Sequence, residues 1–185
     1  MGEKINLELK YFCKDFNLVR NTLRLIGAKK IGIERQKDYF FNLPKEKNKK
    51  VPARLKLRIS GRRQVLIFYK RPNFSIKKAT QASILVLPVK GKKILSLLSK
   101  ALGVKVIVEK QREIWEKGNT VFHLDKVKGI GKIFEMEVRT KPKTLERDKH
   151  NFEKYKEVLL PYLDKVIRES NEDLVLKAKK HLKFT

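Results

Sequence analysis

The chain has very little cysteine and no long apolar run. Its single cysteine, Cys13, excludes an intramolecular disulfide, and no group of cysteines and histidines has the spacing of a zinc site. No uninterrupted apolar stretch approaches the roughly 18 residues of a membrane-spanning helix, and no apolar signal region precedes the first strand-like segment. We therefore expect a soluble cytoplasmic protein that does not contact membranes.

Acidic residues are also scarce. The 185 residues include 20 Asp and Glu against 46 Lys and Arg, which gives a formal net charge of +26. Nucleic acid, nucleotides and polyphosphate are attracted by such a charge, although cations spread over nearly every segment are equally well explained as a solvated surface. Hydrophobic residues make up 41% of the chain, which excludes a disordered protein, and the length suits one domain over residues 1–185.

Charged and apolar residues alternate in short segments that lie far apart in the chain. Alternate side chains of a strand point to the same face. Four pairs share a face by this rule: Glu8 with Lys10, Lys56 with Arg58, Lys110 with Arg112, and Glu135 with Glu137. Carboxylates that hold a dication beside cations that neutralise phosphate would suit a polyphosphate and its metal. Half-solvated strands explain any one pair better, so the pattern alone establishes no site.

The hydrophobic pattern predicts eight strands and three helical regions. The strands are residues 3–12, 30–41, 53–60, 63–71, 80–87, 104–116, 119–127 and 131–140. One helix follows a cap at Asp15 and stops at Gly27, a short one lies within 88–103, and the C-terminal region 142–183 is helical with a break at Pro161. Largely antiparallel strands with helices outside predict an α+β barrel or a strongly curved sheet.

Six short motifs follow one another along residues 5–140. They are Asn6-Leu7-Glu8-Leu9-Lys10, Gln36-Lys37-Asp38-Tyr39-Phe40-Phe41 with Pro44, Leu55-Lys56-Leu57-Arg58, Phe68-Tyr69-Lys70, Lys110-x-Arg112, and Leu124-Asp125-x-Val127-x-Gly129-Ile130-Gly131-x-x-Phe134-Glu135-x-Glu137. In this order they resemble the CYTH superfamily, or triphosphate tunnel metalloenzymes. The segment from Gln36 to Pro44 is similar to the class IV adenylate cyclase branch.

The resemblance implies a fold, a cofactor and a set of site residues. The fold is an eight-stranded antiparallel β-barrel, the triphosphate tunnel, with helices packed outside. The cofactor is Mg²⁺ or Mn²⁺. The implied metal ligands are Glu8, Asp125, Glu135 and Glu137. The implied triphosphate-binding cations are Lys10, Lys56, Arg58, Lys70, Lys110 and Arg112, of which Lys10, Arg58 and Arg112 are the expected catalytic residues.

The resemblance leaves the reaction open. In a cyclase the ribose 3′-hydroxyl of ATP attacks the α-phosphorus, giving cyclic AMP and pyrophosphate; in a triphosphatase, water attacks the terminal phosphorus of inorganic, thiamine or nucleoside triphosphate. The similarity of the Gln36–Pro44 segment to the class IV adenylate cyclases favours cyclisation over hydrolysis. The remaining alternative is a non-catalytic protein that binds polyphosphate or RNA, with non-specific nucleic-acid contact through the basic surface. The family and the apolar faces of the C-terminal helices are compatible with a homodimer, although folding of the single chain can use the same faces equally well.

Two positions bear on these expectations. Asn6 stands where the family has the first glutamate of its opening motif, which removes one negative charge from the expected metal patch and permits a pseudoenzyme. His123 shares a strand face with Asp125, and we expect it to be a structural hydrogen-bonding residue more than an acid or base.

Overall fold

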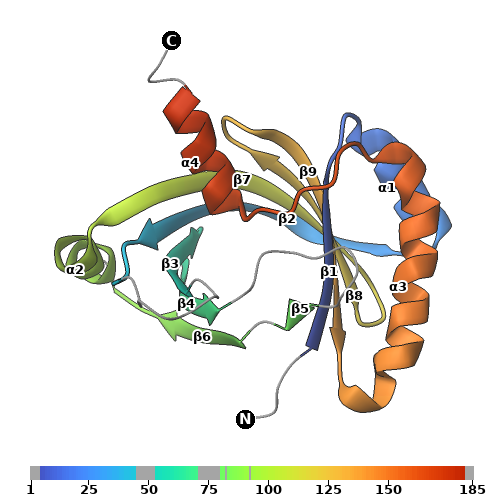
Figure 1. Cartoon of the computed structure of the whole chain (residues 1–185), viewed down its shortest axis with the longest axis horizontal. Coiled ribbons are helices and arrows are strands. Elements are labelled where there is room, and N and C mark those ends of the chain that lie inside the picture. Colours follow the sequence, from blue (N-terminus) through green and yellow to red (C-terminus); the bar gives the residue numbers. More distant parts are fainter. Residues whose placement is uncertain (1–4, 45–52, 71–79, 82, 92, 182–185) are drawn as a thin grey trace.

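The computed structural model describes residues 5–44, 53–70, 80–81, 83–91 and 93–181, which form one curved antiparallel sheet with four α-helices (Figure 1). The strands are β1 (Ile5–Phe12), β2 (Lys29–Phe41), β3 (Ala53–Ser60), β4 (Arg63–Lys70), β5 (Thr80–Gln81), β6 (Ser83–Val89), β7 (Val104–Lys117), β8 (Thr120–Val127) and β9 (Gly131–Thr140). Their order across the sheet is β5-β1-β9-β8-β7-β2-β3-β4-β6. The α+β class expected from the sequence is confirmed.

The helices form where the sequence predicts them. They are α1 (Phe16–Leu25), α2 (Lys93–Leu102), α3 (Leu145–Leu159) and α4 (Asn171–His181). The Asp15 side chain caps α1 by accepting a hydrogen bond from the backbone N–H of Asn17 at 2.8 Å, and Gly27 follows the helix with a φ of 76°. Among the described helices, none is long and apolar enough to cross a membrane.

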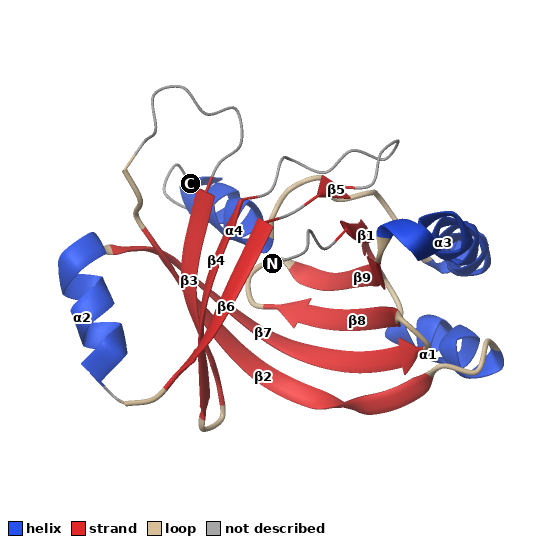
Figure 2. Ribbon diagram, turned by 90° about the horizontal axis from the view of Figure 1, so that it is seen from below, coloured by secondary structure: helices blue, strands red, loops and turns tan. Residues whose placement is uncertain are grey.

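The sheet differs from the expected eight-stranded barrel in two respects, the division of one strand and an open strand order among the described residues. The strand predicted at 80–87 is divided into β5, which pairs with β1, and β6, which pairs with β4, so that nine strands are described instead of eight. Ala82, between them, lies outside the described residues. The described pairings give an open strand order with β5 and β6 at its edges, and the sheet is strongly curved (Figure 2).

The convex face of β1, β9 and β8 is covered by α1 and α3 (Figure 1). The side chains of Phe122, Phe134 and Met136 are fully buried in this layer, where Phe122 contacts Tyr155 of α3 edge-to-face. Burial of these apolar side chains fixes which way each strand faces, because a shift of one residue would expose all of them. The intervening residues of β8 and β9 are therefore held on the concave face.

A smaller apolar cluster closes one end of the concave face. Val175 of α4 and the preceding Ile167 pack with Val106, Val108 and Ile133 of the sheet. The chain that leads to α4 runs along β1, where the N–H of Ile167 donates to the carbonyl of Lys10 at 2.8 Å. The position of α4 follows from these contacts, and Figure 2 shows it across the curve of the sheet.

Candidate functional site

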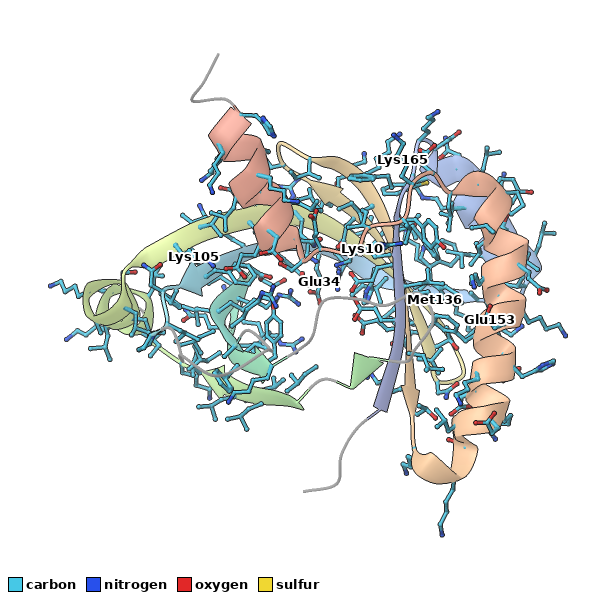
Figure 3. All side chains as sticks on the ribbon, in the orientation of Figure 1. Lys10, Glu34, Lys105, Met136, Glu153 and Lys165 are labelled. Atoms are coloured by element: carbon cyan, nitrogen blue, oxygen red, sulfur yellow. The ribbon has the colours of Figure 1, made fainter. Side chains whose placement is uncertain are left out.

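The strand register brings the alternating charged residues together on the concave face. Directly opposed residues of antiparallel strands share a face. The opposed pairs are Glu8 with Glu137, Lys10 with Glu135, Glu135 with His123, Asp125 with Arg112, Arg112 with Glu34, and Asp38 with Arg58. Figure 3 shows Lys10 and Glu34 toward the concave side, with Met136 toward α3. Six neighbouring strands, β1, β9, β8, β7, β2 and β3, thus form one polar surface.

Asp125 lies at the centre of a buried ion-pair cluster. Its two oxygens accept hydrogen bonds from Lys110 Nζ at 2.8 Å and from Arg112 Nε and Nη2 at 2.7 and 2.6 Å, while Arg112 Nη2 also donates to Glu135 at 2.8 Å. Burial alone would raise the pKa of Asp125, but the charges of Arg112 and Lys110 hold it well below its usual range. Asp125 is therefore ionised and neutralises cations that are themselves buried.

A second ion-pair cluster forms around Asp38. Its carboxylate accepts hydrogen bonds from Lys56 Nζ at 2.7 Å and from Arg58 Nε and Nη2 at 2.7 and 2.8 Å. The two cations lower the pKa of Asp38 against the opposing effect of burial. Burial lowers the pKa of Lys56 to about 7, and burial together with the charge of Arg112 lowers that of Lys110 to about 8. Both lysines therefore titrate close to neutral pH.

An acidic group occupies the β8–β9 side of the concave face. The ligand atoms of His123, Glu135 and Glu137 all lie within 4.8 Å of one another. Burial and the charges of Glu135 and Glu8 raise the pKa of Glu137 to about 8. Burial and the charge of Arg112 lower the pKa of His123 to about 3, so its imidazole is neutral. Its buried Nδ1 has no hydrogen-bond partner among the residues that the structure describes.

This donor set fits a divalent cation. A neutral imidazole and ionised carboxylates are metal ligands, and a dication would relieve the repulsion that now favours a proton on Glu137. The unpartnered Nδ1 of His123 supplies a further ligand atom. Within the described residues, His123, Glu135 and Glu137 are the convergent group of metal-ligating type.

The structure brings most of the predicted site residues together. Of the four predicted metal ligands, Glu8, Glu135 and Glu137 are neighbours, whereas both oxygens of Asp125 are held by Lys110 and Arg112. Of the predicted phosphate-binding cations, the following lie on the concave face: Lys10, Lys56, Arg58, Lys110 and Arg112. The side chain of Asn6 lies outside the described residues.

Lys70 is not brought to this surface. Tyr69 is opposite Arg54, and its ring lies 5.9 Å from Lys56 Nζ, which places Tyr69 on the concave side of β4. The next residue, Lys70, points to the other face, where its ammonium lies 5.9 Å from the ring centroid of Phe68.

Two residues have larger roles than the sequence indicated. Asp38 neutralises two cations. It lies two residues after Gln36 in the same strand, and this spacing indicated that both side chains face the same side. His123, expected to be structural, belongs to the candidate metal group. In both cases the role depends on residues contributed by neighbouring strands.

A known family accounts for this arrangement. The sequence model of the CYTH domain matches residues 4–169. The chain belongs to the CYTH domain family. No curated protein matches the chain in sequence.

Solved structures share the CYTH fold of this chain at low sequence identity. The PH1012 protein of Pyrococcus horikoshii OT3 superposes with a TM-score of 0.73 and 23% identity, covering 92% of this chain and 99% of that chain. A Vibrio parahaemolyticus protein described as a candidate adenylate cyclase gives 0.70 and 16%, with coverage of 94% and 99%. HpAC1 from Hippeastrum, described as having a dominant triphosphatase activity, gives 0.54 and 17%, with coverage of 84% and 88%.

Proposed function

We propose that this CYTH protein is a metal-dependent enzyme that cleaves a triphosphate bound on the concave face of the sheet. The observation that carries the proposal is the convergence of His123, Glu135 and Glu137 immediately beside the buried guanidinium of Arg112. A metal-ligand group next to phosphate-binding cations is the arrangement that a metal–triphosphate complex requires.

The charge of the concave face supports binding of such a complex. Among the described residues of its strands, the carboxylates are Glu8, Glu34, Asp38, Asp125, Glu135 and Glu137, and the cations are Lys10, Arg54, Lys56, Arg58, Lys110 and Arg112. These charges nearly balance, while the whole chain carries +26. The excess positive charge therefore comes from residues other than these, and it attracts anions at longer range.

The cations of the site can exchange their partners for phosphate. Two like charges about 4 Å apart repel by about 4 kcal/mol at an effective dielectric constant near 20, so Lys110 and Arg112 need an anion beside them. Asp125 fills that need, and phosphate oxygens would compete with it for the same donors. The planar guanidinium of Arg112 is suited to bidentate contact with phosphate.

His123, Glu135 and Glu137 are the residues that would hold Mg²⁺ or Mn²⁺, with Glu8 opposite Glu137 in the register. When bound, the dication would polarise the phosphate and lower the pKa of water. Glu137, whose pKa is about 8, holds a proton at neutral pH that metal binding must displace. Arg112 and Lys110 would stabilise the negative charge that develops as the phosphoanhydride bond breaks.

Hydrolysis of the terminal phosphate is the reaction that we propose, because it needs no second substrate group beyond water. Cyclisation of ATP would also need a site that places the ribose hydroxyl. It is kept as the second candidate because of the Gln36–Pro44 motif. In the structure, however, the side chains of this motif interact within the site: Gln36 donates to Glu34 at 2.6 Å, and Asp38 binds Lys56 and Arg58.

Product analysis separates these reactions. Purified protein is incubated with Mg²⁺ or Mn²⁺ and inorganic, thiamine or adenosine triphosphate, and the products are resolved by chromatography. We expect orthophosphate, and no product when EDTA removes the metal. Cyclic AMP with pyrophosphate would establish the cyclase instead. No product from any of these substrates would contradict an enzyme and leave a binding protein.

The low pKa of Lys56 predicts a pH-dependent affinity. We expect metal-free binding of tripolyphosphate, measured by calorimetry in EDTA, to weaken between pH 7 and pH 9. Lys56 and Lys110, with pKa values of about 7 and 8, lose their charges over this interval. Because the bound anion favours the protonated lysines, the dissociation constant should rise by up to about tenfold per pH unit for each lysine.

The control for this prediction is Lys56→Arg, which keeps its charge throughout the interval. Titration of the tripolyphosphate itself is the same with both proteins. A flatter pH dependence in the variant is expected, whereas an unchanged slope would show that Lys56 does not titrate in the binding interval.

A further inference from the structure

The convex face of the sheet carries a second basic surface, on the same segments of β2 and β7 whose concave face carries Gln36 and Lys110 of the candidate active site. It is a groove of about 670 Å³ whose lining includes Arg35, Lys37, Gln111, Lys126 and Lys128. Arg35 and Lys37 flank the concave-face residue Gln36 in β2, so their side chains point to the opposite face. The helices α1 and α3 cover the sheet near the other ends of these strands.

The strand register arranges part of the groove as a row across three strands. Arg35 of β2 is opposite Gln111 of β7, and Gln111 is opposite Lys126 of β8. All three residues are exposed. Within the described part of the chain, Arg35 and Lys126 make no ion pair, so their charges are available to a ligand.

Glu109 is the acidic residue that lines the groove, and it is outnumbered. It lies 3.3 Å from Lys37 Nζ and 3.6 Å from Lys128 Nζ, and its side chain is 42% exposed. One carboxylate shared by two lysines leaves the groove with an excess of positive charge. Lys128 is 77% exposed, which allows it to contact another partner.

We propose that this groove binds the phosphate backbone of a single-stranded nucleic acid. Its positive charge complements the phosphates. Cations two residues apart on a strand are about 6.7 Å apart, and cations two strands apart about 10 Å. Such separated charges suit nucleic-acid phosphates, between which a sugar intervenes, better than the phosphorus atoms of inorganic polyphosphate, which share one oxygen.

The lining of the groove predicts that binding is independent of base sequence. The residues that line it are charged, amide, aliphatic or glycine, and none is aromatic among those the structure describes. Bases therefore have no ring on which to stack there. Contacts to phosphate position a strand without reading its sequence.

The test is fluorescence anisotropy of a labelled single-stranded oligonucleotide with a 5′-hydroxyl end, in EDTA. The groove variant combines Arg35→Gln, Lys126→Gln and Lys128→Gln. We expect it to bind about tenfold more weakly at low salt, and the slope of log affinity against log salt to fall by about two, since each single-strand phosphate contact contributes about 0.7.

A control variant with the same loss of charge combines Lys100→Gln, Lys154→Gln and Lys179→Gln, all at exposed positions on helices. The groove assignment predicts a larger loss of affinity in the groove variant than in this control. Equal losses would overturn the proposal, because they would show only a general effect of net charge.

Two further sets of measurements define the ligand and separate this proposal from the proposed enzymatic function. Inorganic polyphosphate at equal phosphate concentration should compete less well than unlabelled oligonucleotide; binding of polyphosphate alone would overturn the nucleic-acid assignment. The groove variant should cleave triphosphate at the wild-type rate, and Glu135→Gln should bind the oligonucleotide normally. Loss of oligonucleotide binding in Glu135→Gln would place the ligand on the concave face and contradict the groove.

Discussion

Replacing Glu135 with glutamine should reduce metal-dependent triphosphate cleavage by about 100-fold or more. Glu135 belongs to the group of ligand atoms within 4.8 Å of one another, and it accepts a hydrogen bond from Arg112 at 2.8 Å. Glutamine keeps the volume and one carbonyl oxygen but removes the charge that a dication needs. The measurement is the initial rate of orthophosphate release as a function of Mn²⁺ concentration.

The matched control is Glu116→Gln, the same substitution at an exposed position of β7, which should leave the rate unchanged. A second readout does not depend on turnover. Mn²⁺ should raise the melting temperature of the wild-type protein, since a ligand that binds the folded state stabilises it, and this increase should be lost in Glu135→Gln. If Glu135→Gln kept both the wild-type rate and the wild-type increase in melting temperature with Mn²⁺, Glu135 would be excluded as a metal ligand.

Asp125→Ala should lower the free energy of unfolding by about 3–5 kcal/mol. The side chain of Asp125 is fully buried and accepts three hydrogen bonds from Lys110 and Arg112. Its removal leaves two buried cations and, within the described part of the chain, a single carboxylate, Glu135, within hydrogen-bonding distance of Arg112. Urea-induced unfolding followed by circular dichroism measures the loss.

Asp15→Ala is the control for this substitution, because it removes only the cap of α1 and should cost about 1 kcal/mol. Tripolyphosphate should restore part of the stability of Asp125→Ala, since its oxygens can take the place of the missing carboxylate. Equal losses in the two variants, or no effect of tripolyphosphate, would contradict the role given to Asp125.

Much of the fold is predictable from local patterns in the sequence. The Asp15 cap and Gly27 define α1, and the turn at Gly61 separates two strands whose bounds match the prediction closely. The division of the strand at 80–87 was not predictable, because it depends on β1 and β4 pairing with different parts of one segment.

The site is less predictable, because alternation within a strand does not show which strands are neighbours. The motif Phe68-Tyr69-Lys70 predicted that Lys70 faces the site. The pairing of Arg54 with Tyr69 places Tyr69 there instead and turns Lys70 to the other face. The sequence predicted Asp125 as a metal ligand. The register between β7 and β8 places Arg112 directly opposite it, so that the carboxylate pairs with a cation. The roles of such residues are determined by contacts between strands that are distant in sequence.

The most direct test of the account is anomalous diffraction from crystals of the protein grown with Mn²⁺ and tripolyphosphate. We predict a manganese peak within coordinating distance of His123, Glu135 and Glu137, with phosphate density beside Lys110 and Arg112. A manganese peak away from the concave face, or tripolyphosphate bound without contact to these cations, would contradict the proposed site.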